Sequence, residues 1–106
     1  MASLEIDELG GTRRIRVYGE IDMTNAGSLG SRLADECTVT GRAVLDLSDV
    51  SYINSQALNM LQRLGDQLAA APTELIVVAR PDSVAARLFD ITAMNAHLDV
   101  RPSFDV

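Results

Sequence analysis

Residues 44–61 read VLDLSDVSYINSQALNML, and this stretch decides how the chain is organised. Val44 to Leu47 is an apolar run of the length of a buried strand, and a short turn follows it. A helix then begins near Ser55, with apolar residues behind it. A serine hydroxyl at that place points out of the fold beside the positive end of a helix dipole. A phosphate group can be added there, held there and recognised by a partner protein.

The helix that starts at Ser55 is predicted to run to about residue 71. Pro72 ends it because proline cannot continue a helix. Leu75 to Ala79 is a second apolar strand, and continuous apolar runs are typical of parallel strands that are covered on both faces. The apolar residues of the helix recur on one face, with Leu58 beside them: Ala57, Leu61, Leu64 and Leu68.

Two strands are predicted before this region. Leu4 and Ile6 alternate with polar residues, and Gly10-Gly11 is a turn signal. In the segment from Arg13 to Tyr18, hydrophobic and polar side chains alternate, which predicts a strand with one buried face. We expect the two strands to pair as a hairpin, and residues 19–22 to end the second one.

A first helix is predicted from Met23 to Glu36, with Asp22 or Thr24 as the cap of its first turn. Its apolar positions are Ala26, Leu29 and Leu33. Gly27 and Gly30 each cost about 1 kcal/mol relative to alanine inside a helix. Either they allow close approach to a neighbouring element, or the helix is weak.

After the second apolar strand, a helix is predicted from Ser83 to Asp90 with Val84 and Leu88 facing inward. A last short strand is expected over Leu98 to Val100. Strands and helices that alternate and are joined by short connections indicate an α/β sandwich. The 106 residues are enough for one domain, so we expect a single domain over residues 1–106.

Composition narrows the function classes. The formal net charge of -6 disfavours nucleic acid and anionic membrane surfaces as partners. A partner with a basic contact face fits this charge better, although a net charge of this kind mostly reflects solubility. The single cysteine, Cys37, cannot form an internal disulfide, and we expect it to be packed. The sequence has no leader-like start and no long apolar run, so we expect a cytoplasmic protein.

The sequence contains few of the motifs that an enzyme would need. The only histidine, His97, has no second ligand at metal-binding spacing, and no phosphate-binding glycine loop occurs. We therefore expect no cofactor and no metal. Four acids could gather near one end of the sheet, but acids that flank strands more often serve turns and caps: Glu20, Asp22, Asp46 and Asp49. Ser55 has a similar alternative, because Asn54-Ser55 could simply cap the helix.

The order and spacing of three segments resemble the STAS domain, and in particular the bacterial anti-sigma-factor antagonists. The segments are GEID at residues 19–22, LDLSDVSYINSQAL at 45–58 and RLFDIT at 87–92. The resemblance covers nearly the whole chain. It implies a mixed sheet of about five strands with helices mainly on one face. The sequence stops about where the family's last helix would begin, so we expect that helix to be short or missing.

In this family the antagonist binds a serine kinase that is also an anti-sigma factor, which frees the sigma factor for transcription. The kinase phosphorylates a serine at the start of the second helix, the complex dissociates, and a serine phosphatase resets the switch. The resemblance implies that this chain is a substrate and not an enzyme, and that Ser55 is the phosphorylated residue. The partner-binding residues that it implies are Glu20, Asp22, Met23, Asn54, Ser55, Gln56 and Asn59.

The chain departs from the family pattern around that serine. Asn54 replaces the usual Asp, and Gln56-Ala57 replaces Ser or Thr followed by Gly. These departures support a second hypothesis, a non-phosphorylated STAS subunit that regulates a transporter ATPase or a larger signalling assembly. A small enzyme or nucleotide-binding domain is a third hypothesis, which no nucleophile–base set supports.

Overall fold

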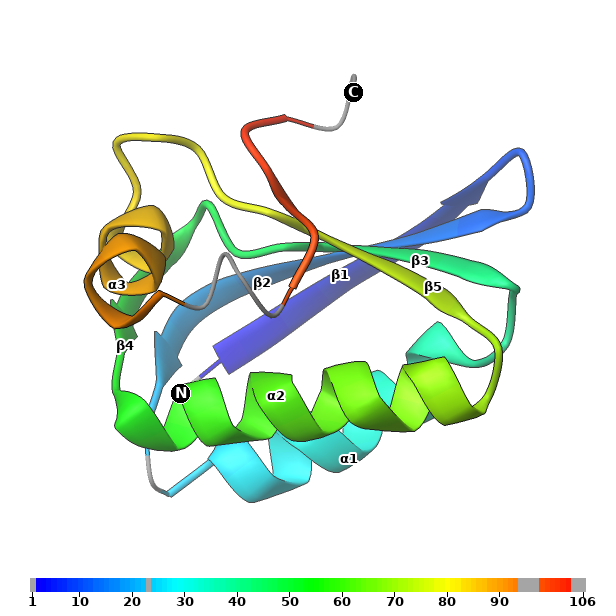
Figure 1. The fold of residues 1–106 in the computed structure, drawn as a ribbon, viewed down its shortest axis with the longest axis horizontal. Helices are drawn as coiled ribbons and strands as arrows, with labels where there is room; N and C mark the ends of the chain where they lie inside the picture. The colour runs from blue at the N-terminus through cyan, green and yellow to red at the C-terminus, as the bar shows by residue number, and fades with distance from the viewer. Residues whose placement is uncertain (1, 23, 94–97, 104–106) are drawn as a thin grey trace.

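The computed structural model describes residues 2–22, 24–93 and 98–103, and these form a mixed sheet with helices packed mainly on one face (Figure 1). The strands are β1 (Ala2–Leu9), β2 (Thr12–Ile21), β3 (Arg42–Asp46), β4 (Val50–Ile53), β5 (Glu74–Val78) and β6 (Val100–Arg101). The helices are α1 (Ala26–Cys37), α2 (Ser55–Ala70) and α3 (Val84–Thr92). The predicted α/β fold, a mixed sheet with helices mainly on one face, is confirmed.

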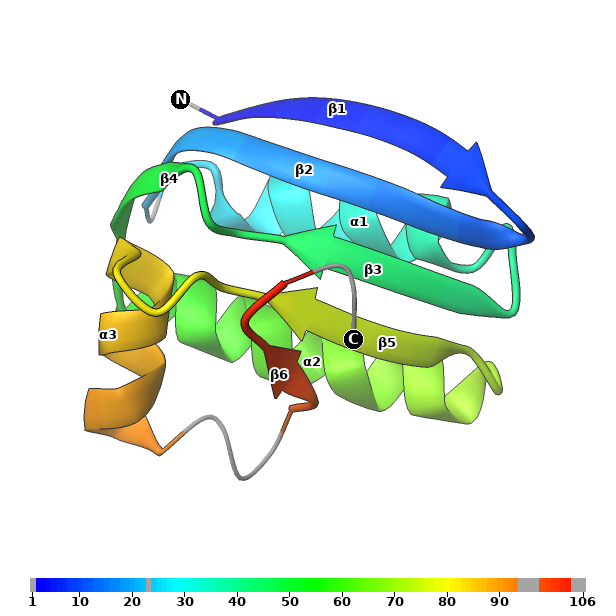
Figure 2. The same ribbon diagram turned by 90° about the horizontal axis from the view of Figure 1, so that it is seen from above.

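Within the described residues the sheet has six strands, five of them in the order β1-β2-β3-β5-β6, with β4 paired to β2 beyond the end of β3 (Figure 2). Among these strands only β1 is antiparallel to its neighbour, and it forms the predicted hairpin with β2. Gly10 and Gly11 make the turn with φ angles of 59° and 77°, which side-chain-bearing residues rarely adopt. Within the described residues, which end at Ser103, no helix follows β6.

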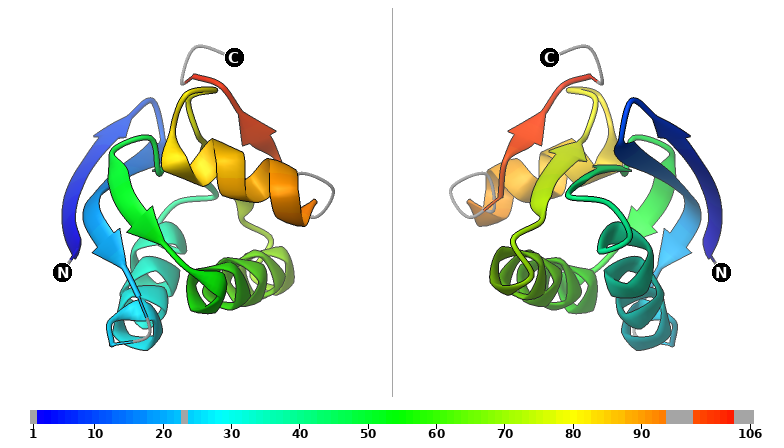
Figure 3. Two further views of the ribbon diagram at one scale, coloured as in Figure 1. Left: turned by 90° about the vertical axis from the view of Figure 1, so that its left-hand side faces the viewer. Right: turned by 90° about the vertical axis from the view of Figure 1, so that its right-hand side faces the viewer.

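Helices α1 and α2 lie side by side on one face of the sheet (Figure 3). Their predicted apolar stripes are buried there, and Cys37 at the end of α1 is buried with them. The opposite face of β3 and β5 carries a separate buried cluster of Val44, Ile76 and Val78. Apolar residues on both faces explain why these two strands read as continuous hydrophobic runs.

The strand β4 corrects the prediction of a turn between the first apolar strand and α2. Val50 and Ile53 are buried, whereas Ser51 and Tyr52 between them are exposed, so the segment lacks the alternation that marks a strand. Its pairing with β2 is a tertiary contact. Residues 19–21, expected to end the second strand, belong to β2 and bend at an irregularity between Gly19 and Glu20.

The inward face of α3 was predicted correctly only in part. Leu88 is half-buried and packs against the core as expected, but Val84 is 44% exposed, and the buried residues of the helix are Ala85 and Phe89. Ser83 is the N-cap, and its hydroxyl accepts a hydrogen bond from the Ala86 N–H at 3.1 Å. The helix therefore presents the large Phe89 ring to the core, one residue out of phase with the expectation. The last strand likewise lies slightly later than predicted, at Val100–Arg101.

Candidate functional site

At the start of α2, one residue caps the helix and the next residue presents an exposed hydroxyl; the sequence alone did not tell which residue has which role. Asn54 has an extended backbone, and its side-chain oxygen accepts hydrogen bonds from the N–H groups of Gln56 and Ala57, at 3.1 and 3.3 Å. Asn54 is therefore the cap. Ser55 is the first residue of the helix, it is exposed, and its hydroxyl has no hydrogen-bond partner among the described residues.

An exposed hydroxyl at this place is chemically accessible. The first N–H groups of a helix lack intrahelical acceptors, and the helix dipole favours negative charge beside them. A phosphate on Ser55 would lie next to the N–H groups that Asn54 now satisfies. Because Asn54 is neutral and the first turn of α2 has no acidic residue, that end of the helix carries no carboxylate of its own.

Acidic residues reach this end of α2 from β2. The parallel register pairs Glu20 with Tyr52 and Ile21 with Ile53, so Asp22 and Asn54 leave the sheet next to each other. Asp22 accepts hydrogen bonds from the Thr24 hydroxyl and backbone N–H, at 2.6 and 2.9 Å, which hold the pKa of its carboxyl below the ordinary value. Asp22 is therefore an anion near neutral pH, and Glu20 beside it is exposed.

The cap of α1 differs from the prediction, which named Asp22 or Thr24. Asp22 and Thr24 form a turn that precedes the helix, and Asn25 is the residue at the cap position. The Asn25 side chain instead ties this turn to β2: its oxygen accepts from the Asp22 N–H at 3.0 Å and its amide donates to the Glu20 carbonyl at 2.8 Å. These bonds stiffen the loop that carries both acids.

The other two acids lie elsewhere. Asp46 is buried and accepts a hydrogen bond from the Ser48 N–H at 2.9 Å, and Asp49 forms an ion pair with Arg80 at 3.4 Å. The strand β4 lies between Asp49 and Asn54, and its five residue steps separate the two by about 16 Å at the usual rise per strand residue. The four acids thus do not gather at one place, and Asp22 and Asp46 serve turns as expected.

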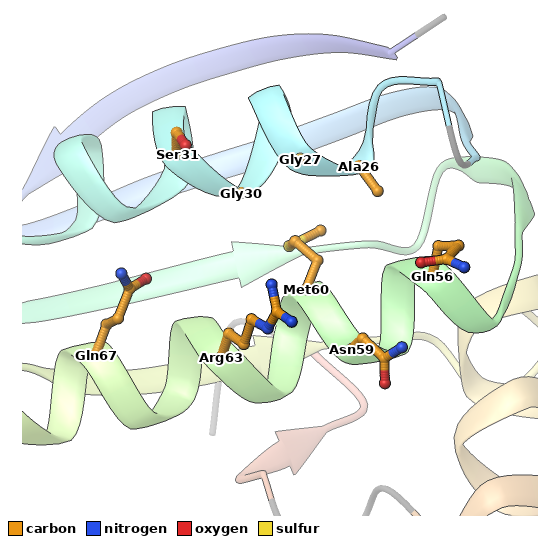
Figure 4. Close-up of a pocket in the computed structure, with 9 residues that line it drawn as sticks. All are labelled: Ala26, Gly27, Gly30, Ser31, Gln56, Asn59, Met60, Arg63 and Gln67. Carbon is orange, nitrogen blue, oxygen red and sulfur yellow. The ribbon is translucent and has the colours of Figure 1, made fainter.

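The remaining predicted contact residues spread along α2. Gln56 and Asn59 are exposed there, the first directly after Ser55 and the second one helical turn further on. Both line a groove between α1 and α2 (Figure 4). Met23 lies outside the described residues.

Two features of this region were not predicted from the sequence. Tyr52 is 50% exposed on β4, opposite Glu20 in the neighbouring strand, and so adds an aromatic surface next to the site. The groove between α1 and α2 depends on how closely the helices approach, which Gly30 permits. A Cβ atom at Gly30 would lie 2.7 Å from Met60 Cγ, so the close-approach interpretation of this glycine is confirmed.

Other chemistry is sparse in the described part of the chain. It has no group of three or more His, Cys, Asp or Glu side chains that could hold a metal ion, and His97 lies outside it. Burial raises the pKa of the Cys37 thiol to about 11, so this thiol is protonated and packed. No helix among the described residues has the length and apolar character needed to cross a bilayer.

Comparisons with known proteins identify the family and agree with the fold. The family model of the STAS domain matches residues 3–105. The structure of an anti-sigma factor antagonist from Mycobacterium paratuberculosis is 25% identical, with a TM-score of 0.86 over 99% of this chain and 89% of that one. Among curated proteins, none matches at the sequence level.

The Bacillus cell fate determinant SpoIIAA is similar in fold. Its unphosphorylated form is 13% identical, with a TM-score of 0.70 over 93% of this chain and 88% of that one. Its phosphorylated form is also 13% identical, with a TM-score of 0.65 over 93% of this chain and 91% of that one.

Proposed function

This chain belongs to the STAS domain family, and we propose that within it the protein is an anti-sigma-factor antagonist switched by phosphorylation of Ser55. In the unphosphorylated state it binds an anti-sigma-factor serine kinase and frees the sigma factor. The observation that carries the proposal is the exposed Ser55 hydroxyl on the first residue of α2, beside a cap that another residue provides.

The electrostatics support a kinase with a basic contact face. Glu20 and Asp22 border the start of α2, and the whole chain has a net charge of -6. Opposite charges of this kind accelerate association and orient the two proteins. The kinase supplies ATP and the catalytic groups, and this chain supplies the accepting hydroxyl, so the proposal assigns it no enzymatic activity.

Phosphorylation would change both the shape and the charge of this contact. A phosphate adds roughly 1.5 to 2 negative charges at neutral pH and three acceptor oxygens. The N–H groups at the start of α2 favour the modified form, while Asp22 and Glu20 repel the added charge. A kinase surface fitted to a neutral hydroxyl loses that fit, and the complex dissociates. A serine phosphatase would then restore the binding form.

The residues next to Ser55 favour one alternative, a STAS subunit that is not phosphorylated and regulates a transporter ATPase or a larger signalling assembly. Gln56 places a long amide side chain directly after the serine, and Ala57, which departs from the glycine of the family pattern described above, is buried. Both changes alter the surface that a kinase would have to accommodate.

The test incubates the purified chain with its cognate kinase and ATP and measures intact mass. We expect a gain of about 80 Da, the mass of one phosphate group, that Ser55→Ala abolishes. Ser28→Ala is the matched control, because Ser28 is also an exposed serine in the first turn of a helix but belongs to α1 and not to α2. It should be phosphorylated like the wild type. No mass gain in the wild type would favour the non-phosphorylated subunit.

Binding measured by calorimetry completes the test. Ser55→Ala should bind the kinase like the wild type, whereas Ser55→Asp should weaken binding by about 100-fold or more, because it places a permanent charge at the contact. Thermal unfolding should show both variants folded, since the side chain is exposed. Equal binding of Ser55→Asp and wild type would contradict a switch at this residue.

A further inference from the structure

The groove between α1 and α2 is a defined feature of the helical layer. It encloses about 440 Å³, a volume in the range of sites that receive small molecules or a few side chains. Figure 4 shows Met60 pointing from α2 toward α1, where glycines leave the α1 wall without side chains. The lining residues are Ala26, Gly27, Gly30 and Ser31 on α1, and Gln56, Asn59, Met60, Arg63 and Gln67 on α2.

The groove is continuous with the start of α2. Gln56 follows Ser55 directly, and Asn59 is one turn further along the same helix, so both belong to the groove and to the surface around the serine. A protein large enough to cover Ser55 from the α1 side therefore also covers the near end of the groove.

The charge of the groove is opposite to that of the rest of the chain. The chain has 15 acidic residues, yet none of those that the structure describes lines the groove, and among the described lining residues Arg63 is the only charged one. Arg63 forms no ion pair or hydrogen bond with any described residue. The arginines that do pair with carboxylates are Arg13, Arg14, Arg16, Arg42, Arg80 and Arg101.

These observations indicate the chemistry of an occupant. The guanidinium of Arg63 can donate two parallel hydrogen bonds to a carboxylate, and the amides of Gln56, Asn59 and Gln67 can donate or accept at the rim. The bare α1 wall and Met60 accept an apolar stem. An aspartate or glutamate on a partner segment fits this combination better than a basic side chain.

We propose that the groove is the second half of the kinase-binding surface and receives an acidic side chain of the kinase, which pairs with Arg63. This proposal rests on the kinase-binding role proposed above. The partner face is then divided by sign: basic opposite Glu20 and Asp22, and acidic opposite Arg63. Such a division fixes the orientation in which the two proteins dock.

Two variants test the groove separately from Ser55. In Gly27→Leu, a side chain is added to the α1 wall of the groove, at a position where a Cβ atom would meet no other atom within 4 Å. In Arg63→Glu, the charge is reversed. We expect each to weaken kinase binding about 10-fold or more, and to slow phosphorylation of Ser55 through KM, with thermal unfolding unchanged or improved.

The matched controls lie on α1 outside the groove. Arg32→Glu makes the same charge change at an exposed arginine that also has no partner among the described residues, and Ser28→Leu adds the same side chain at an exposed position. Both should bind within about 3-fold of the wild type, because isolated changes outside a contact have small effects.

The outcomes separate the two proposals. If both groove variants bind like the wild type while Ser55→Asp does not bind, the groove proposal is overturned and the antagonist function stands. If Ser55→Asp also binds like the wild type, the antagonist function fails as well. If Gly27→Leu instead abolishes a self-association seen by sedimentation and leaves kinase binding intact, the groove belongs to a second copy and our proposal is wrong.

Discussion

Ile21 and Ile53 face each other as a parallel pair, the last residues of β2 and β4, and both are buried. This pair places the acidic turn that follows β2 beside the helix start that follows β4. Asp22 and Ser55 are far apart in the sequence, but each lies within two residues of the pair. The candidate surface is therefore built where two adjacent strands end.

The division of roles between Asn54 and Ser55 predicts different stability effects. Asn54→Ala removes the acceptor for two N–H groups and should destabilise the protein by about 1 kcal/mol, whereas Asn54→Asp retains an acceptor and should cost less than about 0.5 kcal/mol. Asn59→Ala is the control: Asn59 is exposed inside α2, so alanine should be neutral or slightly stabilising. Urea denaturation measures all three, and equal losses for Asn54→Ala and Asn59→Ala would mean that Asn54 is not the cap.

The contact between Gly30 and Met60 predicts a change of sign in a double-mutant cycle. Gly30→Ala should destabilise the wild type by about 1 kcal/mol, because crowding against Met60 Cγ exceeds the gain in helix propensity. In a Met60→Ala background the crowding is gone, and the same change should stabilise by about 0.5 to 1 kcal/mol.

Gly27→Ala is the matched control, since its Cβ would meet no atom within 4 Å. It should stabilise the wild type by about 0.5 to 1 kcal/mol through helix propensity alone. Chemical denaturation measures the free energy of unfolding of the wild type, the two single variants, the double variant and this control. An equal stabilisation by Gly30→Ala and Gly27→Ala would show that α1 and α2 are farther apart than the structure places them.

Burial of Cys37 predicts a loss of stability in alkali. The folded thiol has a pKa of about 11 against an ordinary value of 9.0, so its contribution is complete below pH 9 and is lost as the pH rises toward 11. At about 1.4 kcal/mol per pKa unit, the free energy of unfolding should fall by up to about 3 kcal/mol more in the wild type than in Cys37→Ala. The measurement is urea denaturation of both proteins across this range. Parallel pH profiles would show that the thiol is not buried in the folded state.

Local sequence was sufficient for much of the fold. The glycine pair of the hairpin, the apolar stripe of α2 and the strand β5 are each encoded by neighbouring residues, because turn chemistry and hydrophobic period are local properties. The position of Ser55 at the start of α2 belongs to this group as well. The strand β4 does not, since its four residues show no alternation and become a strand only by pairing with β2.

The α/β class, the hairpin, the main helices and a serine at a helix start follow from the amino-acid sequence, since these depend on residue spacing along one segment. The packing of distant segments was needed to show that Asn54 caps the helix and that the Ser55 hydroxyl has no partner among the described residues. The same packing places Asp22 next to Asn54 and forms a groove between α1 and α2 that no described acidic residue lines. These features depend on how β2 meets β4 and on how closely Gly30 lets two helices approach, which are distances between segments that no local pattern records.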